Sequence, residues 1–263
     1  MSDFLLKTVK ADGTARGGFQ WPLDEGAEVT APDWDPTPVC GGGLHGLLNG
    51  AGNGGLINWS TDAVWIVAEI PDDETVVDLD GNVKVRRCIV RHVGDKTSAP
   101  EFLAAHGHTE GVVSGTATAG DYGSATAGYR GTATAGVSGA ATAGNDGTAT
   151  AGVSGTATAG VSGTATAGDY GTATAGYDGT ATAGDYGTAT AGNRGTATAG
   201  YRGTATAGDS GTATAGERGS IIIAWWDSEL GRRRWVVGEV GMDGIVADTP
   251  YRVVDGALVE VES

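Results

Sequence analysis

Both cysteines and two of the four histidines form the one cluster in this sequence that resembles a metal site. Cys40 and His45 lie in the segment C-G-G-G-L-H, and Cys88 and His92 lie in C-I-V-R-H. Two thiolates and two imidazoles could form a tetrahedral zinc site, but these spacings differ from those of common zinc fingers. Alternation along a strand would place Cys88 and His92 on one face even without a metal. We therefore predict a buried thiol with structural histidines, and zinc at these four residues is the alternative.

The other polar motifs do not form a catalytic set. Gly41–Gly43 precede no Lys-Ser/Thr pair, so they are a weak phosphate loop, and nucleophile motifs are missing from the sequence. The acidic run Asp72–Glu74 has no nearby partner in the sequence, which predicts a solvated loop. His106 and His108 lie in A-A-H-G-H-T-E, which we interpret as a linker. We predict no enzymatic activity and no cofactor; an enzyme within residues 1–110 is the minor alternative.

Pairs of threonine recur with a strict period between Gly115 and Arg218. This block holds thirteen copies of G-T-A-T-A-G-x-x, in which Ser124 and Ala140 replace a threonine. The alternation T-A-T-A places threonine on one face of a strand and alanine on the other. We expect Gly-x-x-Gly to form the corners, because glycine tolerates the positive φ that turns demand. A disordered linker would need the composition but not the constant register, so the block predicts a β-solenoid.

We predict two octapeptides per coil, because one is too short to close a coil. Thirteen repeats then form about six and a half coils, spaced by ~4.8 Å. Alanine should point inward, since a threonine core would have to satisfy every hydroxyl; the alternative buries threonine. The substitutions Ser124 and Ala140 both fall in even-numbered repeats. The odd-numbered repeats form an unsubstituted odd face, which is the better candidate for surface binding: Thr116, Thr118, Thr132, Thr134, Thr148, Thr150, Thr164, Thr166, Thr180, Thr182, Thr196, Thr198, Thr212 and Thr214.

The variable x-x pairs form the corners of the solenoid. A sixteen-residue coil stacks Tyr170 on Tyr186 and sets Arg194 one coil above Asp178. Aromatic and opposite-charge neighbours suit a stacked edge. The competing interpretation, which we favour, is that these pairs are solvated turns.

The segment before the repeats, residues 1–110, predicts an α+β domain. Alternating Val and Ile in Ala63–Ile70 indicate a strand, and Val76–Val93 indicates a hairpin that turns at Asp80-Gly81. Ser98 and Glu101 have the spacing of a capping box that opens a short helix.

The segment after the repeats, residues 219–263, predicts a β capping module on the solenoid of residues 111–218. After Gly219 and Ser220, which keep the register of the repeat, Ile221–Ile223 stand in the positions of A-T-A, and large apolar side chains there would cover the open end of the solenoid. Two further strands are expected, Arg234–Val240 and Tyr251–Val261, and the second turns at Asp255-Gly256.

Composition excludes several classes of protein. Glycine supplies 48 of 263 residues without a three-residue period, which excludes collagen. No run approaches the ~20 apolar residues of a membrane-spanning helix, and the start of the chain is not that of a signal peptide, so we expect a cytoplasmic protein without a membrane partner. The net charge of −16 argues against nucleic acid as a partner. The repeat block itself carries seven acids and four arginines, so it is nearly neutral.

The repeat resembles that of bacterial ice nucleation proteins, whose sixteen-residue coils contain T-x-T-A-G. The matching residues include Thr164–Gly168. The resemblance implies outward T-x-T rows that order water or bind ice. The chain departs from that family in its eight-residue unit, its few coils and its terminal segments. Those segments, C-G-G-G-L-H and V-V-D-G-A-L-V-E-V, look similar to a bacterial and phage family that brackets short repeats with such ends, which implies two caps and no known activity.

Three functions follow as hypotheses. The first is a non-enzymatic solenoid whose odd face binds ordered water, ice or another regular surface. The second is a stiff scaffold, phage-related by resemblance, that presents the N-terminal domain or forms a homodimer through a flat threonine face. The third and weakest is an acidic decoy of nucleic acid, since the acids concentrate outside the repeats.

Overall fold

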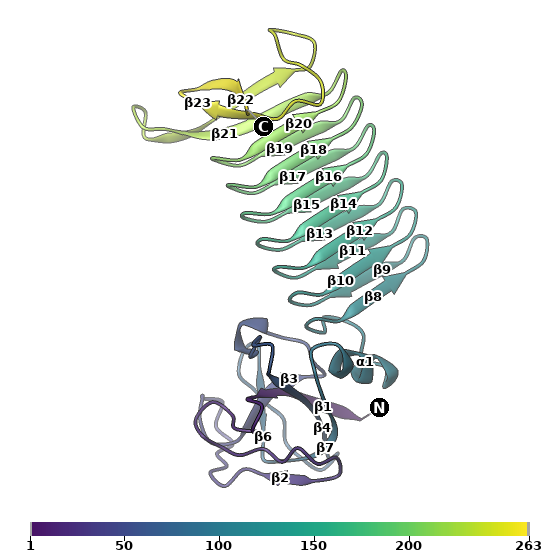
Figure 1. Cartoon of the computed structure of the whole chain (residues 1–263), viewed down its shortest axis with the longest axis vertical. Coiled ribbons are helices and arrows are strands. Elements are labelled where there is room, and N and C mark those ends of the chain that lie inside the picture. The colour runs from purple at the N-terminus through teal and green to yellow at the C-terminus, as the bar shows by residue number, and fades with distance from the viewer. Residues whose placement is uncertain (1, 262–263) are drawn as a thin grey trace. The chain divides into compact units, whose positions relative to one another are not determined.

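The computed structural model describes residues 2–261. It divides into two compact units, Met1–Thr116 and Ala117–Ser263 (Figure 1). No helix in the described part of the chain is long and apolar enough to cross a membrane.

A seven-stranded antiparallel sheet forms the first unit, in the order β2-β7-β4-β1-β3-β6-β5. Its elements are β1 (Asp3–Val9), β2 (Glu28–Thr30), β3 (Leu44–Leu48), the 3₁₀ turn η1 (Gly54–Leu56), β4 (Val64–Ile70), β5 (Val77–Asp78), β6 (Val83–Val85), β7 (Arg87–Gly94) and α1 (Ser98–Ala105). The predicted strand near residues 63–70 is β4. The predicted turn joins β5 to β6, and its residues Asp80 and Gly81 have φ of 59° and 101°. Positive φ at both positions is the requirement of a type I′ hairpin turn.

A β-bulge in β7 changes the face on which His92 lies. Val90 pairs with Ala68, but His92 rather than Arg91 pairs with the next residue, Val67. The extra residue reverses the alternation, so Cys88 lies in the buried core with Val90, and His92 lies on the opposite side of the sheet. The prediction that Cys88 and His92 share a face was therefore wrong.

Helix α1 is capped three residues earlier than predicted. The Oδ1 atom of Asp95 accepts a hydrogen bond from the backbone N–H of Ser98 at 2.9 Å, and Ser98 Oγ accepts one from the N–H of Asp95 at 3.0 Å. This reciprocal pair is a capping box with Asp95 in the first position, instead of the predicted box of Ser98 and Glu101.

Thirteen four-residue strands follow, one from each octapeptide. Odd repeats form β8 (Thr116–Ala119), β10 (Thr132–Ala135), β12 (Thr148–Ala151), β14 (Thr164–Ala167), β16 (Thr180–Ala183), β18 (Thr196–Ala199) and β20 (Thr212–Ala215). Even repeats form β9 (Ser124–Ala127), β11 (Ala140–Ala143), β13 (Thr156–Ala159), β15 (Thr172–Ala175), β17 (Thr188–Ala191) and β19 (Thr204–Ala207). Each strand pairs in parallel with the strand sixteen residues on, as Thr148 does with Thr164. The predicted coil of two octapeptides is confirmed.

Alanine fills the interior of the solenoid. Both alanines of each strand from β10 to β20 are at most 4% exposed, except Ala140, which stands in a threonine position on the outer face. Two sheets lined with methyl groups can approach closely, and every neighbouring threonine then points outward. The inward orientation of alanine is confirmed.

The C-terminal strands extend both sheets of the solenoid. They are β21 (Ser220–Asp227), β22 (Arg232–Glu239), β23 (Tyr251–Val254) and β24 (Ala257–Glu260). β21 pairs in parallel with β19, whereas Tyr251 of β23 pairs with Ala213 of β20. Ile221 and Ile223 are 0% and 1% exposed and belong to the same core as the alanines, so large side chains close the alanine interior at this end.

Candidate functional site

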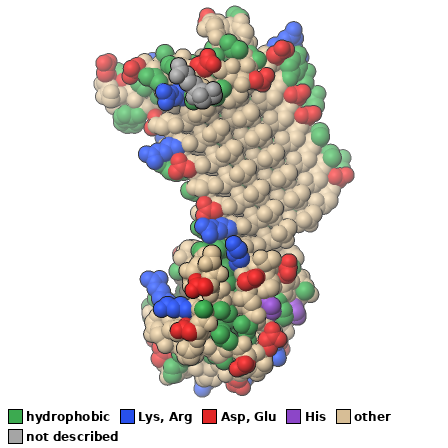
Figure 2. Space-filling view, in the orientation of Figure 1, with side chains coloured by type: hydrophobic (Ala, Val, Ile, Leu, Met, Phe, Trp, Pro, Cys, Tyr) green, Lys and Arg blue, Asp and Glu red, His purple; other side chains and the backbone are tan. Residues whose placement is uncertain are grey.

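The odd face forms a continuous threonine grid on the outer side of the nine-stranded sheet. All fourteen predicted threonines lie on strands β8 to β20. The first threonine of each strand is exposed from Thr116 to Thr196, and the second is half-buried from Thr134 onward. Within a strand the two threonines are ~6.7 Å apart, and rows recur every ~4.8 Å. Figure 2 shows one face of the solenoid as a regular field of uncharged side chains, with charged and hydrophobic side chains along its margins.

The opposite array, on the outer side of β9 to β19, is the even face. Ser124 and Ala140 interrupt it and are both exposed. Where the even sheet continues into β21, Thr206 pairs with Ile222, so an apolar side chain follows the last threonine. The odd face alone repeats threonine in every one of its repeat strands.

Backbone hydrogen bonds between successive coils hold the grid in place. Thr164 N–H donates to the carbonyl of Gly147 at 2.9 Å, and Gly168 N–H donates to that of Ala151 at 3.1 Å. The corners are joined as well, because Ser154 N–H donates to the carbonyl of Asp169 in the next coil at 2.8 Å. Hydrogen bonds therefore connect both the corners and the strands of successive coils, which makes the threonine array rigid.

The corner glycines are required by close packing between coils. None of the glycines between Gly115 and Gly219 has positive φ. A Cβ on Gly155 would lie 2.8 Å from Ala151 Cβ and 3.0 Å from the carbonyl oxygen of Gly139 in the preceding coil. A Cβ on Gly152 would lie 2.9 Å from backbone atoms of Gly136. The prediction that glycine supplies the positive φ was wrong, because glycine instead allows two backbones to approach.

The second variable residue of each corner adopts the left-handed conformation. All thirteen have φ between 54° and 59°, although they are Tyr, Arg, Ser or Asp: Tyr122, Arg130, Ser138, Asp146, Ser154, Ser162, Tyr170, Asp178, Tyr186, Arg194, Arg202, Ser210 and Arg218. This conformation costs roughly 1 kcal/mol for a residue with a Cβ. The backbone N–H groups of eleven of them, from Tyr122 to Arg202, donate hydrogen bonds to the next coil, which offset that strain.

Asp or Asn at the first corner position extends the bonding between coils. Asp121 Oδ1 accepts from Val137 N–H at 2.8 Å, and Asn145 Oδ1 accepts from Val161 N–H at 2.9 Å. Asp169, Asp185 and Asn193 accept in the same way from the residue sixteen positions on. These side chains are structural, which the interpretation as solvated turns did not predict.

Aromatic rings stack along one row of corners. The rings of Tyr170 and Tyr186 are 5.0 Å apart and nearly parallel at 6°, as predicted from the coil length. Arg202 lies over the rings of Tyr186 and Tyr201. On the other row the guanidinium of Arg194 lies 5.7 Å from the centre of the Tyr177 ring, so an aromatic contact is made where we expected Asp178 as neighbour.

The four zinc candidates do not come together. Cys88 is buried in the sheet core, and Cys40 is exposed in the loop before β3. His45 lies on β3 opposite Lys84, and the ring of His92 stacks on Phe102 at 5.3 Å. Within residues 2–261 no group of three or more His, Cys, Asp and Glu could hold a metal ion.

The C-G-G-G-L-H segment wraps around a buried lysine that sequence reasoning missed. Lys84 is 0% exposed, and its Nζ donates to the carbonyls of Val39 and Gly41 at 2.9 and 2.8 Å. Gly41, Gly42 and Gly43 have φ of 117°, 52° and 136°, which only glycine adopts readily in all three cases. The signal in the sequence was a lysine between two valines of one strand.

His45 of the same segment is partly buried, and this burial lowers the pKa of its imidazole.

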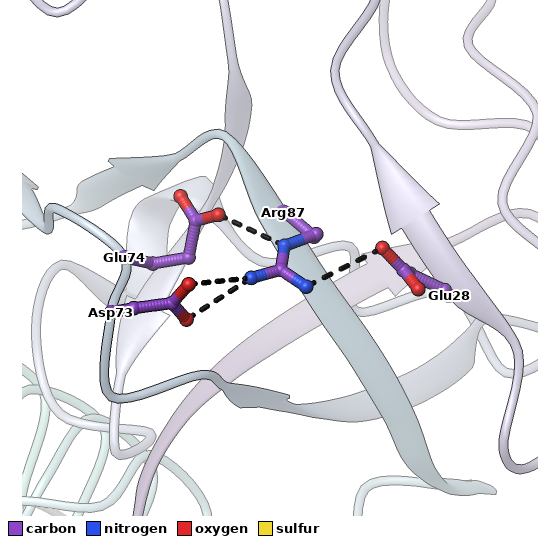
Figure 3. Close-up of polar contacts among 4 residues, drawn as sticks. All are labelled: Glu28, Asp73, Glu74 and Arg87. Atoms are coloured by element: carbon purple, nitrogen blue, oxygen red, sulfur yellow. Dashed lines mark hydrogen bonds and ion pairs between the residues drawn. The ribbon is translucent and has the colours of Figure 1, made fainter.

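An arginine brings the acidic loop and a neighbouring strand together (Figure 3). Arg87 Nε donates to Glu74 at 3.0 Å, its Nη2 donates to Asp73 at 3.0 Å, and Glu28 lies 3.6 Å away. The hydrogen bond to Glu74 is the main cause of the raised pKa of Arg87. The prediction of an unpartnered loop at Asp72–Glu74 was wrong, because the arginine lies 13 residues away in sequence.

The histidines of A-A-H-G-H-T-E pack on the N-terminal unit. His106 stacks on Phe102 at 4.1 Å, and His108 Nε2 lies 3.0 Å from the carbonyl oxygen of Ser2. Both rings also contact Phe4 edge to face. The segment therefore is part of the folded unit, and its interpretation as a linker was wrong.

We expect the two cysteines to differ sharply in reactivity. Burial raises the pKa of the Cys88 thiol to about 12, so almost none of it is thiolate at neutral pH, while Cys40 is exposed. A thiol reagent should modify one cysteine per chain in the native protein and two after denaturation. The Cys40→Ser variant should lose the native modification, whereas equal rates at both cysteines would contradict the burial of Cys88.

Curated proteins similar to this chain are ice nucleation proteins. Ice nucleation protein InaU of Pantoea ananas is 36% identical over 103 residues, which are 39% of this chain and 10% of that protein. The ice nucleation protein of Enterobacter agglomerans is 36% identical over 39% of this chain and 8% of its own length. That of Pseudomonas syringae pv. syringae is 44% identical over 38% of this chain and 8% of its own length. The predicted resemblance is confirmed, although this chain spans a tenth or less of the length of these relatives. No family model and no solved structure matches it.

Proposed function

We propose that this is a non-enzymatic repeat protein whose threonine grid orders water and binds ice, with the odd face as the binding surface. The observation that carries the proposal is the uninterrupted array from Thr116 to Thr214, outward-facing on a solenoid with an alanine core. The similarity to ice nucleation proteins supports the same function.

The grid combines the two properties that ordered water needs. Each threonine offers a hydroxyl that donates and accepts hydrogen bonds, together with a methyl group that limits the directions available to water. Because the coils are hydrogen-bonded to one another, the hydroxyls are already held in rows before water is ordered. A preorganised surface loses little entropy when it binds, so weak individual contacts can add up over many rows.

The absence of charge on the threonine positions favours water over a charged partner. The corners, which lie at the margins of each face, carry the Asp, Glu and Arg side chains of the repeat block. A charged side chain among the threonines would hold water molecules in its own hydration shell. Because the charged side chains lie at the corners, the threonine rows can order water at their own regular spacing. With only seven strands in the odd face, we expect the shaping of ice crystals and not nucleation close to the freezing point.

Ice assays on the full chain test the proposal. We expect the purified protein to partition into slowly growing ice, to shape single crystals and to inhibit recrystallisation. A protein of similar size and charge without repeats should be excluded from the ice under the same conditions. Round crystals, no thermal hysteresis and no enrichment in the ice fraction would refute the function.

A further inference from the structure

Strand β22 forms an open edge of the solenoid sheet. The eight-stranded sheet runs in the order β22-β21-β19-β17-β15-β13-β11-β9, so β22 has β21 as its one neighbour (Figure 1). All eight residues of β22 pair with β21, from Arg232 with Asp227 to Glu239 with Ser220. An edge of this length presents a row of backbone N–H and C=O groups that a further strand can pair with. Charged side chains often protect such edges, and β22 carries Arg232–Arg234 and Glu239, but Trp235 and Val237 between them are 55% and 63% exposed.

The pairing with β21 settles which side chains share the outer face. Thr206 of the even face pairs with Ile222, and Ile222 pairs with Val237. Alternation then places Arg233, Trp235, Val237 and Glu239 on the outer side of β22, in continuity with the even face. In the second half of the strand the exposure agrees with this, because Val237 and Glu239 are exposed while Val236 is half-buried and Gly238 is buried; Arg232 to Trp235 are all exposed.

The outer side of β22 is complementary to itself. If two copies of the strand run antiparallel with Val236 opposite Val236, Arg233 of each copy lies opposite Glu239 of the other. In the same register Trp235 of each copy lies opposite Val237 of the other. Opposite charges and aromatic–aliphatic pairs are the favourable neighbours across strands, and each occurs twice under a two-fold axis. A shift by one residue would place outer side chains against inner ones, so the register is specific.

We propose that two copies of this chain dimerise through β22 in that register. The two eight-stranded sheets then become one continuous sheet, and the even faces of both copies lie on its same side. Arg234 is paired with Asp227 of β21 at 3.0 Å, whereas Arg232 and Arg233 provide local positive charge in a chain of net charge −16, which reduces the repulsion between two acidic copies at this edge. This inference does not depend on ice binding, because it uses a different strand and different side chains.

Charge reversal of the full-length chain tests both the surface and the register. Arg233→Glu places a second carboxylate opposite Glu239 in a homodimer, and Glu239→Arg places a second guanidinium opposite Arg233. Each variant alone should therefore dimerise at least about tenfold more weakly than wild type. A mixture of the two variants restores an opposite-charge pair at both positions of a heterodimer. Sedimentation velocity at low salt should show a wild-type dimer, two weakened variants and a dimer in their mixture.

Arg194→Glu is the matched control, because Arg194 is an exposed arginine in the corner after β17, and β17 lies two strands away from β21 in the sheet. It should leave the wild-type dimer intact. A monomeric wild type, an unchanged dimer in both single variants, or a mixture that stays monomeric would overturn the proposal. Ice assays on the Arg233→Glu variant distinguish the dimer proposal from the proposed function. If this variant still shapes ice, ice binding is supported independently of the outcome of the dimerisation experiment.

Discussion

Lysine in place of both Thr148 and Thr180 is expected to abolish ice shaping by the purified protein. The two positions are exposed on the odd face and lie two coils apart, ~9.6 Å along the solenoid. A lysine ammonium is a compact, strongly hydrated charge, and its long side chain stands above the threonine rows. Ordered water would have to rearrange around both ions, so we expect recrystallisation inhibition to fall by at least about tenfold, the equivalent of ~1.4 kcal/mol of surface binding.

The even face supplies a control with the same local structure. Thr156→Lys combined with Thr188→Lys introduces the same two charges at the same spacing on the other sheet. We expect this variant to keep most of the activity, and both variants to keep the circular dichroism spectrum and Tm of the wild type because all four threonines are exposed. Loss of activity in the even-face variant alone would reverse the assignment of faces. Full activity in both would exclude a threonine grid as the binding surface.

Alanine in place of Gly155 is expected to unfold the solenoid locally. The added Cβ would lie 2.8 Å from Ala151 Cβ, 2.9 Å from the carbonyl oxygen of Gly152 and 3.0 Å from that of Gly139. Two of these atoms belong to backbone that is hydrogen-bonded to the neighbouring coils, so they cannot move without separating the coils. We expect a loss of about 3 kcal/mol or more, measured as a lower guanidinium midpoint by circular dichroism.

Val153→Ala in the same corner separates this effect from a general loss of side-chain contacts. Val153 is 45% exposed, and its truncation should change stability by no more than about 0.5 kcal/mol. A Gly155→Ala protein as stable as Val153→Ala would show that the coils have room for a side chain. The close approach of neighbouring backbones would then not be the reason for glycine at the corners.

Local alternation and a fixed period were sufficient to predict the solenoid. The T-A-T-A pattern assigns alanine to the interior, and the stacking of Tyr170 on Tyr186 follows from the coil length alone. The positive φ at the second corner position could not be predicted in this way. Glycine is needed beside that position because Gly155 lies close to the backbone of Gly139, one coil away. A contact between coils cannot be inferred from the sequence of a single corner.

Three features of the N-terminal unit depend on tertiary contacts and could not be predicted from the sequence pattern. The face of His92 depends on one extra residue in β7, and a bulge leaves the hydrophobic alternation on both sides intact. Likewise, Arg87 neutralises Asp73 and Glu74 only because the fold brings a strand beside a loop. The buried Lys84 was missed because a lysine in a short strand is ordinarily exposed, and its partners are backbone carbonyls that no side-chain pattern reveals.

The number of octapeptides decides which threonine face ends at the apolar C-terminal strands. β21 pairs with the last-but-one repeat strand, β19, and β23 pairs with the last one, β20. Gain or loss of a single octapeptide would leave the C-terminal strands beside the last two repeats, because each strand pairs with the one sixteen residues before it. It would move β21 from the even sheet to the odd sheet, so the odd face would then continue into Ile222. Thirteen, an odd number, leaves that apolar continuation on the even face.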